Sequence, residues 1–142
     1  MIKFLKNVVP ELLFRIVIGF VFIESGWEKF HDLGKVISYF ESLSIPFAHL
    51  QAPFVAGVEL TAGTFVLIGL FTRLASLPLI GIMLVAIKTA KWEDVSDFSS
   101  LLGISEFLYI VILIWLVAQG ANSISADALI CRFFKGKTCK KD

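Results

Sequence analysis

Long apolar runs alternate with short polar segments along the chain. The runs Phe54–Phe71 and Leu74–Ile87 are joined only by Thr72-Arg73, and a later run covers Ser105–Gln119. Much of each run is apolar on every side of a helix, which is typical of a helix that is wholly buried or faces lipid. The 142-residue chain has too few other residues to bury several such helices in a soluble core. The pattern therefore predicts a transmembrane helical hairpin at the centre of a membrane protein.

A more polar span is predicted before this hairpin, at residues 10–30, close to the roughly 20 residues that cross the hydrocarbon region. Small residues allow close backbone approach at membrane helix contacts, so we expect the glycine-containing side of this span to face other helices. At about 100° per residue, this side of the helix forms a glycine stripe that consists of Arg15, Gly19, Phe22, Gly26 and Lys29. Glu24 and Glu28 form a second stripe.

These patterns predict an all-α membrane protein, a single domain built as a four-transmembrane-helix bundle. The spans are expected at residues 10–30, 54–71, 74–88 and 105–120, followed by a cytoplasmic tail at 121–142. Short interfacial helices are expected at both termini (Met1–Val9 and Ala126–Phe134) and in the first loop (Lys35–Leu43). Pro10 and Pro78 are expected in the first turns of their spans, where a missing N–H does no harm. The alternative, a soluble protein with buried helices, lacks the charged outer faces that it needs.

Composition supports the membrane interpretation. Apolar residues make up 57% of the chain and mean hydropathy is +0.84. Charged residues make up 18%, against about 25% in soluble domains. The net charge of +1 provides no field that attracts nucleic acid.

The distribution of basic residues predicts the orientation in the membrane. With four spans, the termini and the Arg73 turn share one side, which holds most of the lysines and arginines, so the positive-inside rule makes both termini cytoplasmic. Cys131 and Cys139 then face a reducing compartment, and we expect free thiols there.

Ionisable residues in or beside the spans are the candidate chemistry. Threading the spans back and forth brings six ionisable residues to one level of the bundle: Glu24, Glu28, Lys29, Glu59, Lys88 and Glu106. Ionisable groups within a membrane are costly unless they are paired, and they often mark function. We expect Glu59 to pair with Lys29 or Lys88, either as a functional pair or as a structural ion pair that fixes helix register.

Other polar residues have simpler interpretations. Arg15 and Arg73 can meet phosphates, or pair with Glu11 and Asp127, at the inner interface. No metal-ligand spacing, glycine-rich phosphate loop or Ser-His nucleophile motif is present.

Three segments in order resemble signatures of the DoxX family. They are LFRIVIGFVFIESGWEKF near the start, VELTAGTFVLIGLFTRLASLPL in the middle and GANSISAD near the end. The resemblance implies a four-helix protein of the bacterial inner membrane with a link to redox chemistry, since DoxX and DoxD relatives are associated with thiosulfate:quinone oxidoreductase. The positions that match are Arg15, Gly26, Lys29, Glu59, Gly63, Arg73 and Asp127.

The candidate sites combine these positions with the ionisable level. The candidates for catalysis are Glu59, Lys29 and Lys88. The substrate-binding set is Arg15, Gly26, Lys29, Glu59, Gly63, Lys88 and Glu106. Arg73 and Asp127 form a motif on the cytoplasmic side.

Three functions fit the sequence. The first is a quinone-interacting subunit of a membrane oxidoreductase; the sequence shows no electron-carrying cofactor of its own, so the redox partner is another subunit and quinone is the one candidate ligand. The second is a non-catalytic membrane anchor for a soluble oxidoreductase, bound through the basic tail. The third is a small transporter, for which four spans are few unless the protein forms a homo-oligomer.

Overall fold

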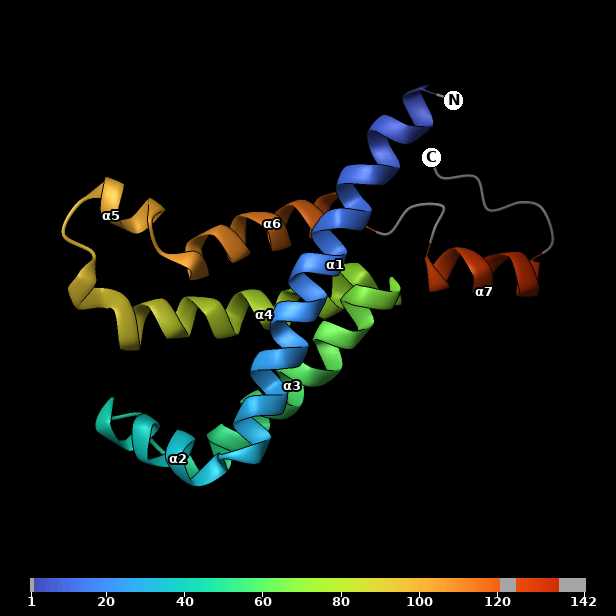
Figure 1. The fold of residues 1–142 in the computed structure, drawn as a ribbon. Coiled ribbons are helices and arrows are strands. Elements are labelled where there is room, and N and C mark those ends of the chain that lie inside the picture. Colours follow the sequence, from blue (N-terminus) through green and yellow to red (C-terminus); the bar gives the residue numbers. More distant parts are fainter. Residues whose placement is uncertain (1, 121–124, 136–142) are drawn as a thin grey trace.

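Helices joined by short turns make up the computed structural model, which describes residues 2–120 and 125–135 (Figure 1). The long helices are α1 (Ile2–His31), α3 (Ala48–Ile68), α4 (Thr72–Ala86) and α6 (Ser105–Gln119). The short helices are α2 (Leu33–Ser42), α5 (Phe98–Leu102) and α7 (Ala126–Lys135). A π-helical turn (Ile87–Lys91) and a 3₁₀ turn (Trp92–Asp94) extend α4. Within the described ranges there is no strand, and the predicted all-helical class is confirmed.

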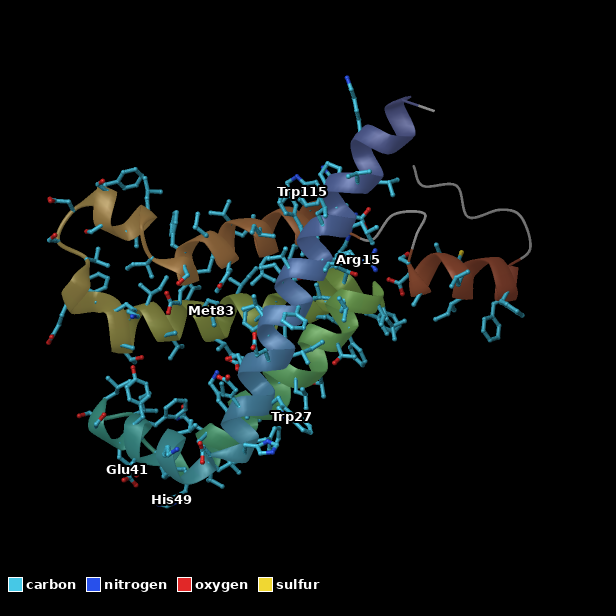
Figure 2. All side chains as sticks on the ribbon, viewed as in Figure 1. Arg15, Trp27, Glu41, His49, Met83 and Trp115 are labelled. Carbon is cyan, nitrogen blue, oxygen red and sulfur yellow. The ribbon has the colours of Figure 1, made fainter. Side chains whose placement is uncertain are left out.

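The four long helices pack as two pairs. Helix α1 packs along α3 and α4 packs along α6, while contacts between α3 and α4 and between α1 and α6 join the pairs (Figure 1). The ring of Phe14 on α1 meets Trp115 on α6 edge to face, with centroids 5.2 Å apart, near the crossing of these helices (Figure 2). The side chains at the centre are almost completely buried: Ile18, Phe22, Val66, Leu79, Leu113 and Leu116.

Glycines bring α1 and α3 into backbone contact. A Cβ atom on Gly26 would lie 2.8 Å from the carbonyl oxygen of Ala56, and one on Gly63 would lie 2.9 Å from the Cβ of Phe22. Both distances are shorter than side chains tolerate, so only glycine permits this approach. The prediction that the glycine stripe of the first span faces another helix is confirmed.

Several predicted boundaries were wrong. Helix α1 begins at Ile2, so residues 2–9 are continuous with it and Pro10 lies inside the helix rather than in its first turn. Pro78 lies in the second turn of α4. Helix α3 begins at Ala48 and contains Pro53 in its second turn. Each proline removes one backbone hydrogen bond, a local loss that packing along the rest of the helix outweighs.

The short helices match their predictions more closely. The predicted amphipathic segment Lys35–Leu43 corresponds to α2, and the last helix is α7 with Asp127 in its first turn. The N–H of Ala128 donates to Ser125 Oγ at 3.2 Å, so Ser125 caps the N-terminus of α7.

The outer surface of the bundle is apolar. Two described segments, Ala48–Ile68 and Thr72–Lys91, are long and apolar enough to cross a bilayer, whereas Ser105–Gln119 is apolar but shorter. Large apolar side chains are exposed on all four long helices. They include Leu13, Phe20, Phe54, Leu74, Val85, Leu108 and Ile114. Exposure of such an apolar surface to water would be unfavourable, whereas contact with the apolar acyl chains of lipid is not.

Cys131 is disulfide-bonded, contrary to the free thiol expected for it. Cys139 lies outside the described residues.

Candidate functional site

A buried carboxylate on α3 is the centre of the site. Glu59 lies on the face of α3 that packs against α1, and its side chain is 2% exposed. Lys29, in the last turn of α1, places its Nζ 2.5 Å from Glu59 Oε2. Ser25, one turn earlier, donates its Oγ hydroxyl to the same oxygen at 3.0 Å. The predicted pairing of Glu59 with Lys29 is confirmed.

Helix geometry explains why these groups meet. Ser25 and Lys29 are four residues apart and share one face of α1. Close packing at Gly26 brings that face against α3. Lys29 Nζ also donates to Ser25 Oγ at 2.5 Å, so the three side chains form a closed network. A buried charge is stabilised only when it is paired and hydrogen-bonded, and Glu59 satisfies both conditions.

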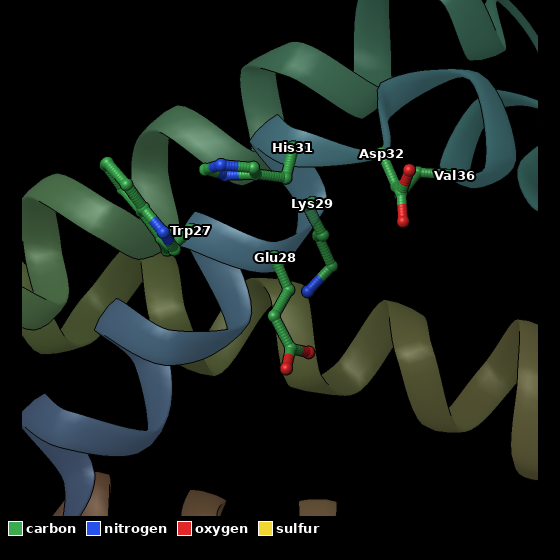
Figure 3. Close-up of a pocket in the computed structure, with 6 residues that line it drawn as sticks. All are labelled: Trp27, Glu28, Lys29, His31, Asp32 and Val36. Carbon is green, nitrogen blue, oxygen red and sulfur yellow. The ribbon is translucent and has the colours of Figure 1, made fainter.

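Lys29 connects the buried carboxylate to an open pocket of about 430 Å³ at the end of α1 (Figure 3). Its side chain is 24% exposed, whereas that of Glu59 is almost fully enclosed. Glu28 and Lys29 extend to the same side of α1 (Figure 3). The remaining lining residues are Trp27, His31, Asp32 and Val36.

The outer edge of the pocket carries a second, exposed ion pair. Lys35 Nζ lies 2.8 Å from Asp32 Oδ2. The hydrogen bond and the charge of Lys35 hold the pKa of Asp32 below its usual value, and Asp32 raises the pKa of Lys35 in return. Because both side chains are exposed, water screens this pair strongly.

The structure does not bring Lys88 and Glu106 to Glu59. Lys88 is exposed on the π-helical turn, and no ion pair of Lys88 is found among the described residues. Glu106 is half-buried in the first turn of α6, where Ser105 Oγ lies 3.5 Å from Glu106 Oε2. Among the described residues, the ion pair of Glu59 is therefore with Lys29 and not with Lys88.

Arg15 lies near the middle of α1, about four turns or roughly 21 Å from Lys29 at 1.5 Å per residue. Its Nε donates to the carbonyl oxygen of Val66 and its Nη2 to that of Leu67, each at 3.1 Å. Its Nη1 lies 3.4 Å from Glu11 Oε1, and both side chains are buried. The guanidinium thus satisfies carbonyl groups at the C-terminal end of α3, where a cation is favoured by the helix dipole.

Arg73 and Asp127 serve other helix ends nearby. Arg73 Nη2 donates to the carbonyl oxygen of Gln119, at the C-terminus of α6, at 3.3 Å. The N–H of Phe71, which precedes α4, donates to the Asp127 carboxylate at 2.9 and 3.1 Å. Each side chain carries a charge opposite to that of the helix-dipole end that it faces, which is the favourable arrangement. The interpretation that pairs Arg15 with Glu11 is confirmed, whereas Arg73 and Asp127 each bind main-chain atoms.

Sequence reasoning missed Ser25 and Gly69. The i,i+4 spacing of Ser25 from Lys29 was a usable signal. Gly69 has a φ of +75°, and a Cβ there would lie 2.2 Å from Arg15 Nη2. Its N–H and that of Leu70 close the end of α3 on the carbonyls of Val66 and Phe65, the pattern of a Schellman motif.

Comparison with known proteins matches much of the chain to one family. Residues 11–92 match the family model described as DoxX, a segment that includes Arg15, Lys29, Glu59 and Arg73. A protein of Bacillus subtilis (strain 168) named "Putative oxidoreductase CatD" is 30% identical over 131 residues, which cover 91% of this chain and 90% of that protein.

A second relative, "Uncharacterized membrane protein Rv3486" of Mycobacterium tuberculosis (strain ATCC 25618 / H37Rv), is 40% identical over 80 residues, 54% of this chain and 48% of that protein. No solved structure gives a significant match.

Proposed function

Because this chain belongs to the DoxX family of membrane proteins, we propose that it is an integral membrane subunit of a redox system and binds quinone beside the Lys29–Glu59 pair. The single observation that carries this proposal is a buried carboxylate, hydrogen-bonded to a lysine that also borders an open pocket. Small-molecule sites commonly combine an apolar surround with a few convergent polar groups. The name of the Bacillus subtilis relative, an oxidoreductase, agrees with a redox role.

The proposed chemistry uses the network as a proton donor and acceptor. Reduction of a quinone to a quinol takes two electrons and two protons. In this proposal Glu59 exchanges protons with a quinone oxygen through Lys29, which borders the pocket, and Lys29 stabilises the negative charge that develops on that oxygen. The electrons come from another subunit, since the sequence carries no motif for an electron-carrying group.

The membrane arrangement is part of the proposal. Helices α1, α3, α4 and α6 are the four spans, in the bacterial inner membrane, with both termini in the cytoplasm. The basic residues support this orientation, because Lys3, Lys6, Arg73 and the tail lie on one side of such a bundle. Reporter fusions after Lys91 and at the C-terminus should place these two positions on opposite sides.

Mass spectrometry of an organic extract tests the ligand. The intact protein, purified in mild detergent, should retain near-stoichiometric quinone. Glu59→Gln and Lys29→Met should each lose it, while Asp32→Asn, in the exposed pair, should keep it. Circular dichroism of each variant establishes that the helices remain. Ordinary bilayer lipid as the sole extract from the wild-type protein would contradict the proposal.

A second candidate is a non-catalytic membrane anchor for a soluble oxidoreductase. The basic tail, residues 132–141, favours it, because such a segment can bind an acidic surface. Deletion of residues 136–142 should then release co-purifying proteins and leave any bound quinone unchanged, which separates the two functions.

A further inference from the structure

Helix α7 presents an uncovered apolar face at one end of the bundle. Leu129, Ile130, Phe133 and Phe134 are 61%, 46%, 90% and 86% exposed. Their spacing of three and four residues places them on one side of the helix. Beyond its N-terminal turn, no other described helix packs along α7, and the helix extends away from the turn between α3 and α4 (Figure 1).

Among the described residues, hydrogen bonds in the first turn of α7 join it to the rest of the protein. The carboxylate of Asp127 accepts the N–H of Phe71, and the N–H of Asp127 donates to the carbonyl oxygen of Gly69 at 3.3 Å. These contacts fix the start of α7 beside the end of two membrane-spanning helices. At that end, Ile68, Phe71 and Leu74 are themselves exposed and apolar. The apolar face of α7 is therefore adjacent to the surface that faces lipid.

The charge of the same segment indicates which surface covers it. From Arg132 to Lys141 the sequence contains Arg132, Lys135, Lys137, Lys140 and Lys141 and no acidic residue. A helix with a strong apolar face and flanking basic residues is typical of binding in the plane of a membrane interface. Clusters of four to eight basic residues next to a membrane span attract anionic lipid headgroups.

We propose that α7 is an interfacial helix that inserts its apolar face into the bilayer beside the α3–α4 turn, held there by anionic headgroups. The ligand is an anionic phospholipid surface. Through Asp127, this attachment acts directly on the turn that joins the two apolar spans. The proposal does not depend on quinone binding or on any redox activity.

Site-directed spin labelling of the full chain in nanodiscs tests it. Single cysteines replace Ala128, Leu129, Ile130, Phe133 and Phe134 in a Cys131→Ser/Cys139→Ser background. Labels at Leu74 and Ser96 provide lipid-exposed and water-exposed references. Nanodiscs contain phosphatidylcholine alone or with 30% phosphatidylglycerol.

With phosphatidylglycerol present, labels at positions 129, 130, 133 and 134 should be several-fold more accessible to oxygen, relative to a water-soluble nickel reagent, than the label at 128. Values at 133 and 134 should approach that at 74. If the oxygen-to-nickel accessibility ratios at 129, 130, 133 and 134 resemble the ratio at 96 in both lipids, the proposal is overturned and a soluble partner is favoured. Dipolar broadening between labels on separate copies would overturn it in favour of self-association.

Hydrogen exchange on the wild-type protein, with its cysteines intact, gives an independent result. Amides of residues 128–135 should exchange several-fold more slowly in nanodiscs with phosphatidylglycerol than in phosphatidylcholine alone. The variant Lys137→Gln/Lys140→Gln/Lys141→Gln should lose most of this difference. Equal exchange in both lipids would contradict the role of anionic headgroups.

Discussion

Arg15 donates its Nε hydrogen to the carbonyl oxygen of Val66, 51 residues later in the chain, at 3.1 Å. This bond, with the second bond to Leu67, fastens the first half of α1 to the C-terminal end of α3. Arg73 does the same for the end of α6, and Asp127 for the start of α4. Three residues of the family resemblance therefore stabilise helix ends, whereas Lys29 and Glu59 form the buried pair far from them.

Substitution of Arg15 by leucine should be strongly destabilising. Two carbonyl groups lose their donor and the buried Glu11 loses a cation, a type of change that costs about 3–5 kcal/mol. Unfolding in mixed dodecylmaltoside and sodium dodecyl sulfate micelles, followed by circular dichroism, measures the free energy of unfolding. The free energy of unfolding of Arg15→Lys should lie between those of the wild-type protein and Arg15→Leu, because an ammonium group keeps the charge but cannot reproduce the planar fork of the guanidinium. If Arg15→Leu unfolds with the same curve as the wild-type protein, the contacts of Arg15 with the end of α3 do not contribute to stability.

Gly69→Ala should destabilise the same end. The residue has a φ of +75°, and an added Cβ overlaps the Arg15 guanidinium and the Ser125 side chain. The strain alone is about 1–2 kcal/mol, and the displaced guanidinium adds to it. Gly81→Ala is the matched control, since nothing lies within 4 Å of a Cβ there. Equal unfolding free energies for the two variants would contradict this account.

The backbone contact at Gly26 predicts a second pair of variants. Gly26→Ala forces α1 away from α3 and should cost about 1–3 kcal/mol, as overpacking does. Gly57→Ala, whose Cβ would meet only Phe30 Cζ at 3.8 Å, should be neutral or slightly stabilising, because alanine favours the helix. The same detergent unfolding assay compares them. Two equally tolerated substitutions would mean that the helices can separate at no cost.

Lys29 and Glu59 should be energetically coupled. Lys29→Met leaves the buried Glu59 carboxylate without its cation and should cost a few kcal/mol, whereas Glu59→Gln leaves a partly exposed lysine and should cost less. The double variant should cost less than the sum, with a coupling of about 1–3 kcal/mol. A double-mutant cycle at pH 7 measures it. The exposed pair Asp32→Asn/Lys35→Gln is the control and should show no measurable coupling. An equally large coupling in the exposed pair would contradict the conclusion that burial makes the Lys29–Glu59 pair strong.

Much of the fold follows from local patterns in the sequence. Uninterrupted apolar runs specify α3, α4 and α6, and the spacing of Gly26 and Lys29 specifies which side of α1 meets its neighbour. The charge of Glu59 is sufficient to predict that it pairs with a lysine, because an unpaired carboxylate inside an apolar bundle is too costly. Charge alone could not distinguish Lys29 from Lys88.

The sequence by itself determined the helical elements, their apolar surfaces and the existence of a buried ion pair, because these depend on periodicity and on the cost of desolvating charge. The tertiary structure alone decided which lysine pairs with Glu59 and that Arg15 caps α3. Both depend on how closely α1 approaches α3, and that distance is set by backbone contact at Gly26 and Gly63. Contacts between segments so far apart in the chain have no local signal, so only the packed helices reveal them.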